Sequence, residues 1–101
     1  MAETTAKQRR KRNSRVSPDD WSVADAGGSE ITVSLVAVPL GTETVEYRVN
    51  DAGAWTALAD IDPDDYTISA LDAGLTSVRL RASGVFGQGA VSAAKTATVT
   101  A

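Results

Sequence analysis

Residues 44–58, TVEYRVNDAGAWTAL, and residues 76–83, TSVRLRAS, decide the fold of this chain. Apolar and charged residues alternate in both stretches: Val45, Tyr47 and Val49 with Glu46 and Arg48 in the first, and Val78, Leu80 and Ala82 with Arg79 and Arg81 in the second. Alternation with a period of two predicts strands that have one buried face and one solvent face. The polar segment Asn50–Gly53 follows the first strand, and it predicts a type I turn whose last residue, Gly53, is left-handed. The two stretches therefore predict antiparallel strands and a tight hairpin.

Shorter segments outside these stretches predict the rest of an all-β fold. The further expected strands are 21–23, 30–38, 66–71 and 95–100, separated by turn-forming residues at 25–29, 72–74 and 83–89. Pro39 ends the second of these strands because proline cannot donate to a ladder. In strand 66–71, we expect Tyr66, Ile68 and Ala70 to share one face. About seven short strands without a helical period predict an antiparallel β-sandwich. Its expected core centre is Leu35, Tyr47, Ile68, Leu71, Val78 and Leu80.

The composition excludes several kinds of chemistry. A chain of 101 residues fits one domain. It contains no cysteine and no histidine, so it has no disulfide, no thiol nucleophile and no imidazole base. No apolar run approaches the roughly 18 residues of a membrane-spanning helix. We therefore expect a protein that is not an enzyme and that has no cofactor, no metal ion and no membrane partner.

The charge of the chain is strongly segregated. Residues 1–15 carry six cations against the single acid Glu3, whereas residues 16–101 carry four cations against twelve acids. The segment AETTAKQRRKRNSR, residues 2–15, has no apolar periodicity, so alone it is expected to be a disordered basic arm. No apolar stretch follows it, as a secretory signal would require, and we expect synthesis and retention in the cytoplasm.

The order of several short motifs resembles bacterial and phage fibronectin type III modules. The carrying residues are Tyr47-Arg48-Val49 with Gly53-Ala54-Trp55, then Ile68 to Leu71 with Gly74 and Val78 to Ala82, and finally Gly84, Gly87, Gly89 and Ser92. The resemblance covers about residues 18–100. It implies an immunoglobulin-like sandwich for residues 18–101, preceded by the basic arm at residues 1–17. Two positions depart from the family pattern, because Leu35 replaces a frequent Trp and Thr76 replaces a Tyr; Trp21 and Trp55 are candidates to compensate for the lost core area.

Three features of the predicted sandwich are candidates for binding. Asp60-x-Asp62-x-Asp64 matches the start of a calcium loop, but Asp65 and Leu71 replace its required Gly and Glu, so we expect a solvated acidic loop. The arginines at 48, 79 and 81 are expected on one outer face, where they either pair with Glu46 or form an anion-binding stripe. Phe86 lies at the tip of a loop with which this family often binds partners, and it either contacts a partner or folds back over the sandwich.

The basic arm carries the functional prediction, through Lys7, Arg9, Arg10, Lys11, Arg12 and Arg15. A module without a secretory signal suits a virion, which is assembled in the host cytoplasm and later released. Because phages use such modules on capsids, tails and fibres, the resemblance implies a virion structural or decoration protein, present in many copies per particle. In this interpretation, the arm anchors the displayed sandwich to other proteins of the capsid, neck or tail.

Two alternatives remain open at this stage. In one, residues 7–15 bind the phosphates of a nucleic acid, and the chain is a small nucleic-acid-associated protein. In the other, the loops around Phe86 make the module an adhesin for a host surface or a carbohydrate.

Overall fold

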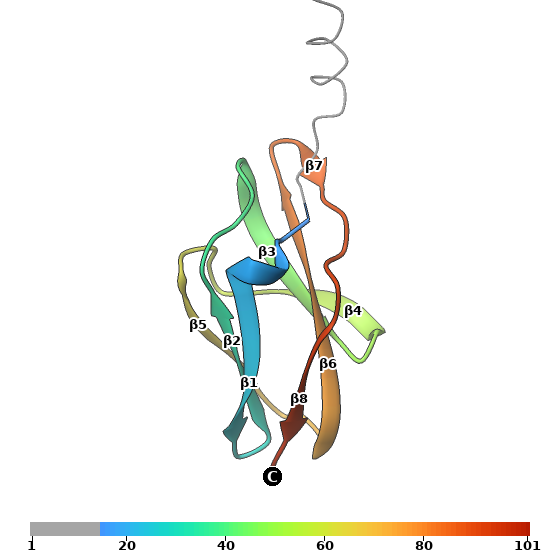
Figure 1. Cartoon of the computed structure of the whole chain (residues 1–101). Coiled ribbons are helices and arrows are strands. Elements are labelled where there is room, and N and C mark those ends of the chain that lie inside the picture. Colours follow the sequence, from blue (N-terminus) through green and yellow to red (C-terminus); the bar gives the residue numbers. More distant parts are fainter. Residues whose placement is uncertain (1–14) are drawn as a thin grey trace, which may run out of the picture.

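The computed structural model of the chain describes residues 15–101. These residues form one turn of 3-10 helix and eight strands: η1 (Pro18–Asp20), β1 (Trp21–Gly27), β2 (Glu30–Leu35), β3 (Thr42–Val49), β4 (Ala52–Ala57), β5 (Asp64–Ile68), β6 (Gly74–Gly84), β7 (Gly87–Gln88) and β8 (Lys95–Val99). The strands form two antiparallel sheets (Figure 1). One sheet has the order β1-β2-β5. In the other, β4, β3 and β6 are neighbours, and β7 and β8 both pair with β6. The predicted antiparallel two-sheet sandwich is confirmed.

The core lies between the two sheets and is built by the inward residues of each strand. Four of the six residues expected at its centre are buried, namely Leu35, Ile68, Val78 and Leu80. The other two, Tyr47 and Leu71, are only partly buried and pack against the core from its margin. Trp21 lies directly across from Leu35 in the β1–β2 ladder and is 2% exposed. The large aromatic that the family places on the second strand is therefore supplied here by the first.

The folded body begins two residues earlier than the expected boundary at residue 18. Val16 is 0% exposed and belongs to the core, although the sequence placed it in the arm. Ser17 then caps η1, since its side chain accepts a hydrogen bond from the Asp19 amide. Lys95 Nζ also donates to the Pro18 carbonyl at 2.7 Å, which ties this entry segment to the start of β8. The chain is thus fixed in position from Val16 onward.

Several local predictions are wrong in part. The strand expected at residues 30–38 ends at Leu35, before Pro39 is reached. Gly53 is left-handed as predicted, with φ of 75°, but the turn type differs. The β3–β4 hairpin closes through Asn50 and Asp51 alone, with φ of 54° and 52°, and Val49 pairs with Ala52. Two central residues with positive φ define a type I′ turn, whose twist matches the flanking strands better than the predicted type I turn. The strand expected at residues 66–71 runs instead from Asp64 to Ile68. Ala70 leaves it with φ of 59° and is exposed.

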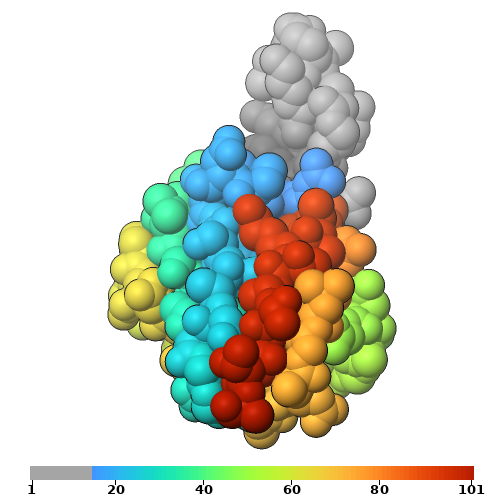
Figure 2. All heavy atoms as spheres, turned by 60° about the horizontal axis from the view of Figure 1, so that its bottom comes forward, coloured from blue at the N-terminus to red at the C-terminus, as the bar shows by residue number. Residues whose placement is uncertain are grey.

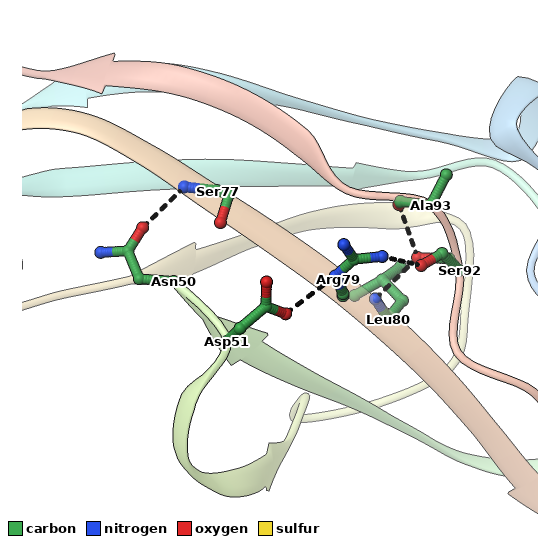
Figure 3. A network of polar contacts seen from close by, with 7 residues as sticks. All are labelled: Asn50, Asp51, Ser77, Arg79, Leu80, Ser92 and Ala93. Carbon is green, nitrogen blue, oxygen red and sulfur yellow. Dashed lines mark hydrogen bonds and ion pairs between the residues drawn. The ribbon is translucent and has the colours of Figure 1, made fainter.

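Between β7 and β8, Ser92 continues the hydrogen bonding along the edge of β6. Its amide donates to the Leu80 carbonyl at 2.9 Å, and its hydroxyl accepts from the Leu80 amide at 2.9 Å. Arg79 Nη1 donates to the Ser92 carbonyl at 3.0 Å, so a polar network links this segment through Arg79 to Asp51 in the β3–β4 turn (Figure 3). Because Ser92 is 2% exposed, its hydroxyl replaces a ladder bond that water could not supply.

The last strand, β8, continues along the same edge of β6 to the end of the chain. Figure 2 shows β8 lying between β1 and β6, so it bridges the two sheets. Next to it, the Asp25 carboxylate accepts hydrogen bonds from the Thr100 hydroxyl at 2.7 Å and from the Thr100 amide at 3.2 Å. These bonds, together with one from the Gly27 amide, lower the pKa of Asp25 below its ordinary value, the Thr100 hydroxyl having the largest effect.

Candidate functional site

The basic arm is the first candidate, and the structure describes only its last cation. Lys7, Arg9, Arg10, Lys11 and Arg12 lie outside residues 15–101. Arg15 is exposed and directly precedes the buried Val16. The described chain therefore starts at a fixed point, at the end of the sandwich that holds η1 and β7 (Figure 1). The C-terminus lies at the opposite end.

The loops at the arm-bearing end are packed tightly on each other. The Val85 amide donates to the Gly41 carbonyl at 3.1 Å, and Thr42 pairs with Gly84. A side chain at Gly41 would meet the Phe86 ring at 2.7 Å, so the half-buried ring folds back against the β2–β3 loop.

Two apolar side chains besides Phe86 project from this end. The sequence-based prediction names Phe86 alone. Leu40 is 88% exposed and Val85 is 64% exposed. A signal for both was present, because each lies beside a turn-forming glycine, where a strand can no longer bury its side chain.

The acidic loop does not bring its carboxylates together. Asp64 and Asp65 belong to β5, and no group of three or more acidic side chains within residues 15–101 is placed to hold a metal ion. Tyr66 is the ordered feature here, since its hydroxyl donates to the Asp62 carbonyl at 2.6 Å. Burial raises the pKa of Tyr66, and the nearby carboxylates of Asp60, Asp64 and Asp62 add to this effect.

The three arginines gather on the outer face of the five-stranded sheet, as expected. Arg81 lies across from Glu46 and donates to its carboxylate at 2.8 and 3.1 Å. Arg79 lies across from Arg48 and donates instead to Asp51 at 2.8 Å. The predicted pairing with Glu46 is confirmed for Arg81. We call the set Glu46, Arg48, Trp55, Arg79 and Arg81 the arginine face.

Trp55 joins this face from the neighbouring strand β4. Its ring centroid is 4.4 Å from the Arg81 guanidinium carbon and 5.9 Å from that of Arg48, which are cation–π distances. Trp55 therefore packs on the outer face near the sheet edge and does not replace missing core area. Alternate residues of a strand share a face, so a two-residue turn places Arg48 and Trp55 on the same face. The length of the turn was the missing information.

These surfaces are suited to non-covalent binding. The arm supplies cations, the arm-bearing end supplies apolar loop side chains, and the arginine face combines guanidinium groups with an indole. None of the helical segments between residues 15 and 101 has the length and apolar character needed to cross a membrane.

Comparison with known proteins gives a structural answer but no sequence relative. No family model and no curated protein sequence matches the chain. A fibronectin type III domain derived from human KIAA0970 protein matches with a TM-score of 0.64 and 14% identity, over 99% of this chain and 82% of that one. The sixth fibronectin type III domain of human fibronectin type III domain containing protein 3 matches with a TM-score of 0.56 and 23% identity, over 89% and 88%. An Fn3-like protein from Clostridium thermocellum matches with a TM-score of 0.58 and 19% identity, over 80% of this chain and 88% of that one.

At these identities the likeness concerns the fold alone. The chain therefore has a fibronectin type III-like fold, an antiparallel sandwich of two sheets, as its motifs suggested.

Proposed function

We propose that the chain is a non-enzymatic structural or decoration protein of a phage particle. It is present in many copies, with its sandwich displayed and its basic arm attached to proteins of the capsid, neck or tail. The observation that carries the proposal is the separation of charge, with six cations and one acid before Val16 and an excess of acids after it. Such a chain presents two different surfaces to its surroundings.

The position of the arm favours attachment at one end. Val16 is fully buried, so residues 1–15 join the body at one fixed point beside η1. The arm can therefore hold a partner at this end while the rest of the sandwich faces away. Arginine and lysine in the arm pair with carboxylates or carbonyl groups of a protein, and arginine can do so through two parallel hydrogen bonds.

The acidic body suits a displayed module. Most of its twelve acids lie on exposed positions, including the run from Asp60 to Asp65. A surface rich in carboxylates keeps closely spaced copies soluble and apart from one another. The same surface has little affinity for nucleic acid, which leaves the arm as the point of attachment.

Nucleic-acid binding by the arm is the competing function. The acidic body does not prevent it, because fifteen extended residues reach about 50 Å, whereas the Debye length at physiological salt is about 8 Å. Salt sensitivity does not separate the two functions, since ion pairs with protein and with phosphate both weaken as salt rises. Only the identity of the target separates them.

The direct test is to look for the protein in purified particles of the phage that encodes it. Quantitative mass spectrometry should find the chain at many copies per particle, in a fixed ratio to the major capsid or tail protein. Nuclease treatment of opened particles should leave it attached. If the chain is absent from particles, or leaves with the digested DNA, the structural function is wrong and the nucleic-acid function replaces it.

A further inference from the structure

Arg48 differs from the other arginines of the arginine face because no carboxylate neutralises it. Arg81 has Glu46 and Arg79 has Asp51. Within the part of the chain that the structure describes, the Arg48 side chain forms no ion pair and no hydrogen bond, and the residue directly across the β3–β6 ladder is the like-charged Arg79. Its Nε is buried without an acceptor, and the residue as a whole is half-buried.

This arrangement is unfavourable in the free protein and becomes favourable with an anionic ligand. A buried donor without an acceptor destabilises the fold, as do like charges directly across a ladder. Trp55 holds Arg48 in place by a cation–π contact but cannot take its charge. A carboxylate matches the flat guanidinium group, since its two oxygens accept parallel hydrogen bonds from two nitrogens. A carboxylate bound at this face would neutralise the charge of Arg48.

The strand beside this position indicates that the carboxylate belongs to a polypeptide. β4 is the end strand of its sheet, and the residues Ala52–Ala57 include no charge and no proline. Charges and prolines are the usual means by which edge strands avoid pairing with another chain. By contrast, β5 at the edge of the other sheet begins with Asp64 and Asp65. Unlike β5, β4 therefore carries no acidic side chain of its own that would repel an extended acidic segment.

The spacing of strands places such a segment within reach of Arg48. A segment added along β4 would lie about 4.8 Å beyond it and about 10 Å from β3. Every second side chain of the added strand would lie on the outer face beside Trp55, where a Glu carboxylate and the long Arg48 side chain can meet. Backbone pairing with β4 then supplies general affinity, and Arg48 selects for the acid.

We propose that Arg48, Trp55 and the edge of β4 form a binding site for an extended, acidic segment of a partner protein. The site is separate from the basic arm and does not depend on what the arm binds. A polypeptide occupant is preferred over an acidic sugar because one face of the Trp55 ring is already stacked by Arg81, and because a sugar cannot pair with a strand edge.

The test uses the full chain labelled with ¹⁵N and a capped octapeptide of alternating Thr and Glu. The peptide should shift the Trp55 indole N–H signal and the amide signals of β4, whereas the peptide with Gln in place of Glu should bind at least about tenfold more weakly. Arg48→Ala should weaken the Glu peptide by about tenfold or more, as loss of a charge-assisted hydrogen bond does. The affinity of Arg48→Lys for the Glu peptide should lie between those of the parent and Arg48→Ala, because lysine keeps the charge but lacks the planar guanidinium group.

A matched variant separates this site from the arm. Conversion of Arg9, Arg10, Lys11 and Arg12 together to Ala should leave the Trp55 and β4 shifts unchanged. The inference is overturned if Arg48→Ala, with a well-dispersed spectrum, binds as tightly as the parent, or if the shifts at Trp55 disappear with the arm cations. It is also overturned if an oligogalacturonate shifts Trp55 and the Glu peptide does not. Each of these results leaves the proposed role in the particle intact, since that role is judged by attachment to particles.

Discussion

Two neighbouring residues on β6, Leu80 and Arg79, should contribute differently to the free energy of unfolding because they lie on opposite faces of the sheet. Leu80 points into the core and is fully buried, whereas Arg79 lies on the outer face with a third of its side chain exposed. Leu80→Ala should lower the free energy of unfolding by about 2–5 kcal/mol, because it leaves a cavity between the sheets. Arg79→Ala should lower it by less than about 1 kcal/mol, since its pair with Asp51 is exposed to solvent. Urea unfolding of both variants measures this difference, and equal losses would contradict the assignment of the two faces.

Arg48 and Arg81 give a second comparison at the residue scale, because they share Trp55 but differ in pairing. Arg48→Thr removes an unpaired buried donor and a like-charge contact and introduces a good strand former, so the free energy of unfolding should stay the same or rise by up to about 1 kcal/mol. Arg81→Thr leaves Glu46 without its partner and should destabilise the protein. Thermal unfolding of the two variants in the same buffer is the measurement. A clear loss for Arg48→Thr would show that the cation–π contact with Trp55 outweighs the unpaired donor and the like-charge contact.

At the scale of elements, the close approach of the β2–β3 loop to the end of β6 fixes the arm-bearing end. A side chain at Gly84 would meet the Gly41 carbonyl and, at 2.8 Å, the Glu43 amide. Because these neighbours are backbone atoms, they cannot move aside cheaply. Gly84→Ala should therefore destabilise the protein by about 1–3 kcal/mol, while Ser83→Ala, one residue earlier on the same strand, should have little effect. A stable Gly84→Ala variant with unchanged amide signals at residues 39–43 would contradict this packing.

The link between the β1–β2 hairpin and the chain end predicts a pH dependence. The hydrogen bonds from Thr100 and Gly27 hold the pKa of Asp25 below its ordinary value. As the pH falls through the ordinary carboxyl pKa of about 3.9 and below it, the unfolded chain therefore binds a proton that the folded chain resists. The stabilisation by Asp25 is present above that pH and is lost below it.

Unfolding temperatures between pH 6 and pH 2.5 measure this effect. Asp25→Asn should unfold at a lower temperature than the parent at pH 6. The gap between the two proteins should shrink as the pH falls. A gap that stays constant across the range would mean that Asp25 is no better stabilised in the folded chain than in the unfolded chain.

The elements that the sequence predicted correctly are those in which one residue pattern dominates. Alternation placed the strands and faces of β3 and β6 because each strand has a buried and a solvated side. Other features depend on contacts between distant segments, which no local pattern contains. Val16 is buried in a core built by strands that are distant in the sequence, and Ser92 replaces a ladder bond only because β7 and β8 are separate. Asp51 pairs with Arg79 across 28 positions of sequence, and no local pattern indicates that Arg48 is left without a carboxylate.

At the scale of the whole molecule, two unlike parts meet at one end of the sandwich. The fold explains how the body is held together without disulfides, since both sheets bury an apolar face against each other. Among residues 15–101, the core begins at Val16, and the sequence of residues 1–15 has no apolar pattern that could extend it. Deletion of residues 1–15 should therefore leave the unfolding temperature within a few degrees of the parent. A large drop, measured by thermal unfolding, would show that the arm supports the fold.

Attachment to DNA-free particles tests the central claim most directly. Empty particles assembled without the protein should take up the intact chain and retain it through sedimentation. The chain without residues 1–15, and the variant with Arg9, Arg10, Lys11 and Arg12 changed to Ala, should stay in the supernatant although both remain folded. If empty particles fail to take up the intact chain while free DNA binds it, with a slope of log binding constant against log salt concentration approaching about −5, the arm is a nucleic-acid-binding segment and the structural role is wrong.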